Sequence, residues 1–391
     1  MSLSNKTILF AWEIGEGLGH LPPLKAIAQT LKREGASVVF ALRDAVQTRA
    51  ELAELGAPIL PAPFWPTPAP PPSPSGTYAD ILAGNGYGAS ANIRALIEAW
   101  DAVFGVTRPD LIVCEHAPSA ALCAFGRIPV AFVGNGFVVP PSDAPEFPSY
   151  EPGKGEALRQ RPILAAMQEA LAGLGRSPPK TICEPFRGVF RGVYTFPSLD
   201  TYRGMRREPV LGPIEPLPAL SALPATRRLF AYSAADYSGI DELARSLMDL
   251  GPEASAYFRG ALGARAAVIK SRGVHVYDTA PSLSAILPGA DAVFSHAGTG
   301  FAHAALAAGR PHIVSPRHFE ALVTARRLEE MGAGIVVHPF EPKRFRDAVK
   351  RAFDDSAVRT AAQKAGEAAQ EFMKTAAPLE TTCAALRKIL T

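Results

Sequence analysis

The feature that most constrains the fold is a regular alternation of short apolar segments with helical patterns. Thr7–Trp12 reads as a buried strand that ends at a glycine-rich turn. Apolar residues then recur at helical spacing from Leu24 to Leu31, and Ser37–Leu42 begins a second strand. Short buried strands that alternate with helices predict parallel βαβ units in a doubly wound sheet.

The same rhythm continues through the chain and restarts in its second half. Two more strands are expected at 109–114 and 128–133, around a helix near 117–125. The strands expected in the second half are Arg228–Tyr232, Ala267–Lys270, Val274–Tyr277, Ala292–Ser295 and His312–Ser315. The pattern predicts an α/β protein with two Rossmann-like doubly wound domains that face each other across a cleft.

Proline marks the boundary between the two halves. Five prolines fall between Pro209 and Pro224 without clear periodicity, which indicates a linker. We therefore expect an N-terminal domain at 1–208, a linker at 209–224 and a C-terminal domain at 225–391. The last helix is a candidate to cross back to the N-terminal domain.

Composition argues against several classes of partner. The formal net charge is +3 over 391 residues and no run of Lys or Arg stands out, so neither nucleic acid nor an anionic membrane is indicated. The four cysteines lie far apart without CxxC spacing, so neither a zinc site nor a disulfide framework is expected. No apolar stretch is long enough for a membrane span, and a cytoplasmic location is expected.

Three segments carry a family resemblance. They are residues 12–44, which contain the turn GEGLGHL, residues 196–213 (FPSLDTYRGMRREPVLGP) and residues 274–337, which contain SHAGTGFAHAALAAGRP. Together they resemble the bacterial UDP-glycosyltransferase-like enzymes of the GT-B fold, which include macrolide and antibiotic glycosyltransferases. The resemblance implies metal-independent transfer of a sugar, with inversion, from a nucleotide-diphosphate donor to a hydroxyl of a small apolar acceptor. The nucleotide sugar is then a co-substrate, and no further cofactor is expected.

The resemblance places a catalytic base at His20, which ends the glycine-rich turn. An imidazole with a pKa near roughly 6.5 is suited to take a proton from a hydroxyl at neutral pH. The family's partner Asp follows the strand that here reads LIVCEH, so Glu115 takes its place. Alternatives stay open: His20 could only cap the following helix, and Glu13 or Glu16 could partner it or replace it.

The second lobe carries the expected donor site. His296, Ala297, Gly298, Thr299 and Gly300 follow a strand and open a helix. Small residues leave backbone amides able to point at an anion, and the helix dipole favours negative charge there. A diphosphate fits this position, with His296 and the Thr299 hydroxyl as added donors.

The chain departs from the family pattern at other donor positions. Ala304 replaces a Glu that binds ribose, and Thr279 and Ser282 replace a Trp and a Gln, so that Ala280 lies where the base is held. Glu320 matches an acid that binds the sugar hydroxyls, followed by Ala321 in place of an amide. The donor base is therefore left open between uracil, thymine and guanine.

The acceptor is expected to lie in the N-terminal domain. Glu13, Gly17, Trp65 and Phe137 are the predicted contacts, because apolar side chains gather in the likely loops and strand ends. The proline-rich segment 61–76 is expected to form a stiff surface loop, with a loop over the acceptor entrance as its functional alternative.

Two other functions fit parts of the pattern. A sugar-nucleotide epimerase uses the same two-lobe architecture with acidic residues in the cleft. A non-catalytic sugar-nucleotide-binding protein would explain the replaced donor contacts. The oligomeric state is left open between a monomer and a homodimer.

Overall fold

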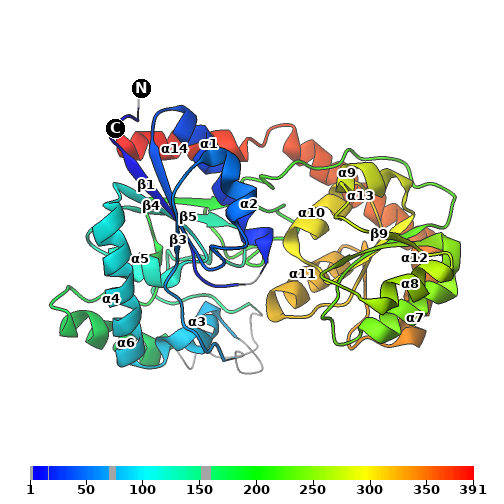
Figure 1. Ribbon diagram of the computed structural model, residues 1–391, viewed down its shortest axis with the longest axis horizontal. Coiled ribbons are helices and arrows are strands. Elements are labelled where there is room, and N and C mark those ends of the chain that lie inside the picture. Colours follow the sequence, from blue (N-terminus) through cyan, green and yellow to red (C-terminus); the bar gives the residue numbers. More distant parts are fainter. Residues whose placement is uncertain (1–2, 16, 70–75, 151–159) are drawn as a thin grey trace. The chain divides into compact units, whose positions relative to one another are not determined.

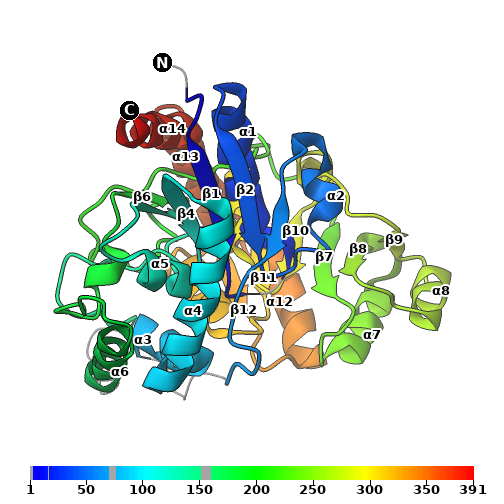
Figure 2. The same ribbon diagram turned by 60° about the vertical axis from the view of Figure 1, so that its left-hand side comes forward.

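The computed structural model describes residues 3–15, 17–69, 76–150 and 160–391. The chain divides into two compact units (Figures 1 and 2). Unit 1 contains Met1–Ile214 together with Ala377–Thr391, and unit 2 contains Glu215–Ala376.

Unit 1 is built on a six-stranded parallel sheet. Its strand order is β3-β2-β1-β4-β5-β6. The strands are β1 (Thr7–Trp12), β2 (Ser37–Leu42), β3 (Ile59–Pro61), β4 (Leu111–Glu115), β5 (Val130–Gly134) and β6 (Phe190–Val193). The helices are α1 (Leu21–Arg33), α2 (Arg49–Leu52), α3 (Tyr78–Leu82), α4 (Ser90–Thr107), α5 (Pro118–Ala124), α6 (Gln160–Gly173) and α14 (Pro378–Leu390).

The C-terminal helix α14 belongs to unit 1. Its apolar residues Cys383, Leu386 and Leu390 are buried in the same core as β1 and α1. The hydroxyls of Tyr194 and Thr382 are 2.8 Å apart and tie the helix to the end of β6. Figure 1 shows this red helix beside the blue α1.

Unit 2 repeats the same sheet topology. Its strand order is β12-β11-β10-β7-β8-β9, again all parallel. The strands are β7 (Leu229–Ala234), β8 (Ala254–Arg259), β9 (His275–Tyr277), β10 (Ala292–Ser295), β11 (His312–Val314) and β12 (Gly334–Val336). The helices are α7 (Ile240–Leu250), α8 (Ala264–Ser271), α9 (Leu283–Ile286), α10 (Thr299–Ala307), α11 (Phe319–Glu330), α12 (Pro342–Asp354) and α13 (Ser356–Met373).

One predicted strand is wrong. Ala267–Lys270 lies inside helix α8, and the strand next to β7 is β8, which begins at Ala254. A four-residue apolar run does not distinguish a strand from a helix. The preceding alanines favour a helix, whereas β8 shows the alternating burial of a strand. The other predicted strands are confirmed to within two residues at each end.

Each of the two sheets has its own topological switch point, at the same place in the strand order. In unit 1 the chain leaves β1 for β2 on one side and later returns to β4 on the other; in unit 2, β7 has β8 and β10 as its neighbours. In open α/β sheets, ligands bind outside the carboxyl ends of the strands where the order reverses. The loops after β1, β4, β7 and β10 are therefore the places to look for a site.

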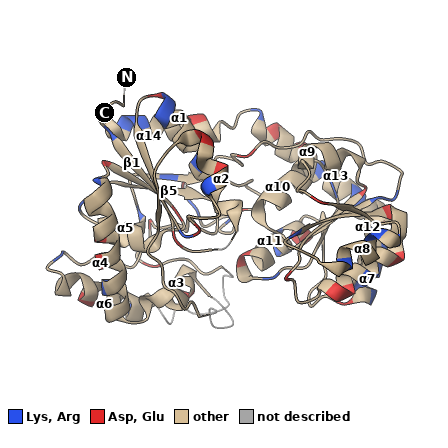
Figure 3. Cartoon of the chain, in the orientation of Figure 1, with Lys and Arg blue, Asp and Glu red and all other residues tan. Residues whose placement is uncertain are grey.

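Charged residues of both signs are interspersed over the helices of both units (Figure 3). Within the described ranges, no helix is both long enough and apolar enough to cross a bilayer. Of the proline-rich segment, Pro61 ends the edge strand β3, where a missing N–H is tolerated. Residues 62–69 form neither helix nor strand, and residues 70–75 lie outside the described residues.

A buried ion pair fixes the segment that leads out of unit 1. Arg206 and Asp200 have side chains only 3% and 4% exposed, with Nε 3.1 Å from Asp200 Oδ2. The Arg206 guanidinium also donates to the carbonyls of Gly136 and Val139 and to Glu208. In the sequence, residues 196–213 stand out only by their family resemblance, and nothing in them indicates the ion pair between Arg206 and Asp200.

Replacing Arg206 should therefore destabilise unit 1. Because Arg206→Met leaves Asp200 as an uncompensated buried charge, we expect a loss of about 3–5 kcal/mol in the free energy of unfolding. Arg245→Met removes an exposed pair with Glu242 and should change little. Urea unfolding of both variants is the measurement, and equal losses would contradict this account.

Candidate functional site

His20 and Glu115 meet at the switch point of unit 1. His20 ends the short 3-10 helix Leu18–His20 that follows β1, and Glu115 is the last residue of β4. Parallel pairing aligns Trp12 with Glu115 across the two strands. The Nδ1 atom of His20 lies 2.7 Å from Glu115 Oε2, and the two side chains are 15% and 4% exposed. With Nδ1–H donating to the carboxylate, the lone pair of the neutral ring is on Nε2.

Two neighbours fix the orientation of the imidazole. The Trp12 indole stacks on it with ring centroids 5.1 Å apart and planes at 22°. Gly15, whose φ is +102°, also lies close to the ring; a Cβ there would be 2.2 Å from His20 Nε2. Gly17 also has a positive φ, +81°, and precedes the 3-10 helix. The glycine-rich turn thus lets the backbone approach the imidazole more closely than any side chain would allow.

Glu13 contacts a different element. Its buried carboxylate accepts from the Ser119 hydroxyl at 2.6 Å and from the Ser119 backbone N–H at 2.8 Å, at the start of α5. Burial raises the pKa of Glu13 to about 8, against the lowering effect of these hydrogen bonds. The geometry therefore pairs His20 with Glu115 rather than with Glu13. Glu16 lies outside the described residues, and contact of Glu13 with an acceptor stays a prediction.

The predicted acceptor aromatics lie in two places within unit 1. Phe137 is buried and stacks on Tyr150, with centroids 5.4 Å apart and planes at 12°. Its ring also meets His116 edge to face at 6.4 Å. Trp65 instead packs on Gly86, where a Cβ would be 2.9 Å from the indole. The structure thus places Phe137 in contact with His116, which is itself a neighbour of His20.

In unit 2, His296 joins three strand ends. Burial lowers its pKa to about 4, so the ring is neutral. Its Nδ1 lies 2.8 Å from the Ser315 carbonyl oxygen and therefore carries the hydrogen; its Nε2 accepts from the Ser233 hydroxyl at 2.8 Å. The single N–H of the neutral ring thus holds the loop after β10, and a direct contact of His296 with a diphosphate stays a prediction.

The loop after His296 leads into helix α10. Ala297 has a φ of +58°, and its N–H donates to Ser295 Oγ at 3.0 Å. Gly298 is the N-cap of α10 and makes no side-chain cap hydrogen bond. A Cβ on Gly298 or Gly300 would meet nothing within 4 Å. The first N–H groups of a helix have no partner within the helix itself, and helix N-termini are common binding places for anions.

Two predicted donor residues meet beside this helix. The Thr299 hydroxyl donates to Glu320 Oε1 at 3.1 Å, and Glu320 lies in the first turn of α11. Ala304, in α10, is buried in the core, and Ala280 is exposed in the loop between β9 and α9. No group of three or more His, Cys, Asp or Glu suited to a metal occurs among the described residues.

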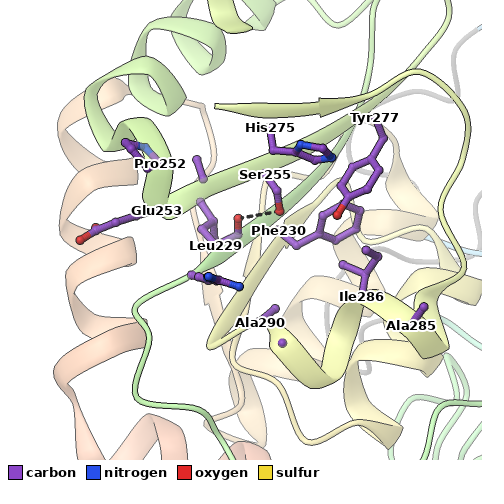
Figure 4. A pocket seen from close by; sticks show the side chains of 13 residues that line it. Leu229, Phe230, Pro252, Glu253, Ser255, His275, Tyr277, Ala285, Ile286 and Ala290 are labelled. Carbon is purple, nitrogen blue, oxygen red and sulfur yellow. Dashed lines mark hydrogen bonds between the residues drawn. The ribbon is translucent and has the colours of Figure 1, made fainter. Parts of the chain in front are cut away.

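A separate cavity of about 420 Å³ opens near the amino ends of strands in the unit 2 sheet, away from the loop after β10 (Figure 4). The amino ends of β7 and β8 border it through Leu229, Phe230 and Ser255, together with His275 and Tyr277 of β9. Ligands of parallel sheets bind at the carboxyl ends of the strands. This cavity is bordered by amino ends, so it is not where a donor is expected to bind.

Comparison with known proteins supports the assignment of the fold. Residues 268–384 match the family described as erythromycin biosynthesis protein CIII-like, C-terminal domain. The chain is also 37% identical over 84 residues to the 3-alpha-mycarosylerythronolide B desosaminyl transferase of Saccharopolyspora erythraea. That match covers 21% of this chain and 20% of the relative, so the chain spans about a fifth of the length of that curated relative.

Solved structures match over nearly the whole chain. CalG4, the calicheamicin glycosyltransferase, has a TM-score of 0.69 at 20% identity, and the match covers 98% of both chains. The glycosyltransferase VinC, in complex with dTDP, has a TM-score of 0.61 at 16% identity and covers 98% of this chain and 99% of its own. The chain therefore has the GT-B fold, and its resemblance to bacterial antibiotic glycosyltransferases is confirmed.

The contact between Gly15 and His20 is testable without a substrate. Gly15→Ala adds a Cβ 2.2 Å from the present position of Nε2 and forces alanine into φ +102°. We expect the imidazole to leave Glu115 and the free energy of unfolding to fall by about 1–3 kcal/mol. Histidine ¹⁵N NMR and urea unfolding measure the two effects.

Gly19→Ala is the matched control for this change. Gly19 lies in the same turn, but a Cβ there meets nothing within 4 Å. The control should retain the wild-type spectrum of His20, and the same spectrum in Gly15→Ala would refute the steric argument.

Proposed function

We propose that the chain is a glycosyltransferase that moves a sugar from a nucleotide-diphosphate donor to a hydroxyl of a small, apolar acceptor, with inversion. The observation that carries this proposal is the 2.7 Å contact of His20 with Glu115 at the switch point of unit 1. A histidine oriented by a buried carboxylate is the arrangement of a general base.

In this proposal His20 activates the acceptor. Glu115 holds the tautomer in which Nε2 carries the lone pair, and Nε2 takes the proton of the acceptor hydroxyl. The oxygen attacks the anomeric carbon while the bond to the nucleotide diphosphate breaks. The Glu115 carboxylate then stabilises the imidazolium that forms. One displacement of this kind inverts the anomeric centre.

Unit 2 binds the donor in this proposal. The amides of the first turn of α10 hold the diphosphate and stabilise the charge that develops on it as it leaves. This electrostatic role is one that a divalent cation fills in other enzymes, so we propose that transfer needs no metal. Glu320, placed by Thr299, accepts from sugar hydroxyls. Since VinC is seen with dTDP, thymidine diphosphate comes first among the nucleotides to test.

The comparisons favour transfer over the two alternatives. The proteins matched above are named as glycosyltransferases, and none as an epimerase. A non-catalytic binding protein has no need of the base–carboxylate contact in unit 1. In this proposal, the replacements at Thr279, Ser282 and Ala304 change which base and sugar the donor site accepts, and do not abolish the site.

The general base is tested by substitution. We expect His20→Ala to lower the rate of transfer by about 10²–10⁴-fold, because the hydroxyl then has no positioned base. Glu115→Gln should lower it less, since the amide still holds the ring but does not stabilise the imidazolium. Transfer from dTDP- and UDP-sugars to hydroxylated aromatic and macrolide acceptors, followed by mass spectrometry, is the measurement.

His275→Ala is the control for the loss of a histidine, because His275 is exposed and lines the cavity near the amino ends of β7 and β8, away from the proposed donor site. Its transfer rate should equal that of the wild type. Transfer by His20→Ala at close to the wild-type rate would remove His20 from the mechanism.

The anion site is tested by a charge at Gly300. Gly300→Asp places a carboxylate at the start of α10, where a Cβ has open space. The charge suits the helix dipole, so folding is retained, but it repels a diphosphate. We expect nucleotide affinity to fall by about ten- to a hundredfold.

Gly300→Asn is the neutral, nearly isosteric control. Thermal shift with dTDP, UDP, GDP and ADP reports binding, because a ligand of the native state raises its melting temperature. Equal nucleotide affinity in the Asp and Asn variants would exclude the first turn of α10 as the diphosphate site.

A further inference from the structure

His116 is a buried histidine that the mechanism above does not use. It follows Glu115 directly, is 6% exposed and has a φ of +49°, an uncommon conformation for a residue with a side chain. Its carbonyl accepts from the Ile14 N–H at 3.0 Å, which fixes the backbone there. The imidazole lies among other rings, with centroids 6.1 Å from His20, 6.0 Å from Tyr78 and 6.4 Å from Phe137.

Neither ring nitrogen of His116 has a hydrogen-bond partner among the described residues. Burial lowers the pKa of His116 to about 3, so the ring is neutral and presents one N–H donor and one acceptor nitrogen. Buried polar atoms are nearly always paired, and leaving them unpaired is costly. An aliphatic or phenyl side chain would fill this place without that cost.

The same imidazole borders a small enclosed cavity of about 10 Å³. Tyr78, Phe132, Phe186 and Arg191 also line it. This volume admits one water-sized group, such as a hydroxyl or a carbonyl oxygen. The Arg191 guanidinium is already engaged by Glu208 and by backbone carbonyls. The His116 imidazole can therefore form a hydrogen bond with a polar group that enters this cavity.

We infer that His116 binds a second oxygen of the acceptor, next to the hydroxyl that His20 deprotonates. This inference rests on the proposed function. Rings with centroids 6.1 Å apart are within reach of two neighbouring oxygens, each in a hydrogen bond of about 2.8 Å. The neutral imidazole donates to a carbonyl or accepts from a hydroxyl.

The substrate class follows from this pairing. The acceptor is a vicinal diol or a hydroxy-ketone rather than a lone alcohol. His116 is then a specificity-determining residue, whereas His20 remains the base.

A matched pair of probes tests the inference in the wild-type protein. Both 1,2-dihydroxyanthraquinone and 2-hydroxyanthraquinone carry the 2-hydroxyl, and only the first has a neighbouring hydroxyl. We expect the first to bind about tenfold more tightly, as one hydrogen bond to a buried partner allows. Isothermal titration calorimetry measures both dissociation constants.

Two variants assign the preference to His116. His116→Phe keeps a ring but removes both nitrogens, so the two probes should bind equally. His116→Asn tolerates a positive φ and keeps a donor and an acceptor, so it should retain part of the preference. Thermal unfolding checks that both variants fold.

The outcomes separate this inference from the proposed function. Equal binding of the two probes by the wild type, a preference that survives in His116→Phe, or no binding of either probe would overturn the inference. A permanently bound water beside His116 predicts the first of these results. Nucleotide binding and transfer to other acceptors report on the proposed function independently.

Discussion

The parallel pairing of β1 with β4 is the constraint on which the rest of unit 1 depends. It sets Trp12 opposite Glu115 and brings the loops after the two strands together, although 95 residues separate His20 from Glu115. Backbone hydrogen bonds buried in the sheet hold this register. The distance between imidazole and carboxylate is therefore set by a rigid element rather than by a loop.

Close approach of the Gly15 backbone to the His20 imidazole is the second requirement of the site at the carboxyl ends of β1 and β4. A Cβ on Gly15 would clash with the His20 imidazole, and the Trp12 indole stacks on that ring. Nearby, the buried Glu13 is hydrogen-bonded to Ser119. The ring nitrogens of His116 have no hydrogen-bond partner among the described residues, and His116 directly follows Glu115, which positions the proposed base.

The two units share one strand order but present different groups at the carboxyl ends of their strands. In unit 1 the carboxyl ends of β1 and β4 present a titratable pair, which suits proton transfer. In unit 2 the loop after β10 presents backbone amides, and the neutral His296 serves to hold that loop. A helix N-terminus offers fixed partial charge, so the same strand order can bind an anion without a titratable group.

The sequence by itself determined the strand–helix alternation, the two lobes, and the glycine-rich turns that mark both sites. These are local properties, because periodicity and turn chemistry act over a few residues. Local pattern failed at Ala267–Lys270, where a short apolar run is equally compatible with helix α8.

Only the tertiary structure decided which groups meet. It paired His20 with Glu115 rather than with Glu13, turned the His296 N–H to Ser315, and joined Thr299 to Glu320. It also left His116 buried without a partner among the described residues. The physical reason is that hydrogen bonding and burial depend on distances between segments far apart in the chain. Those distances are set by sheet register and packing, which no local pattern encodes.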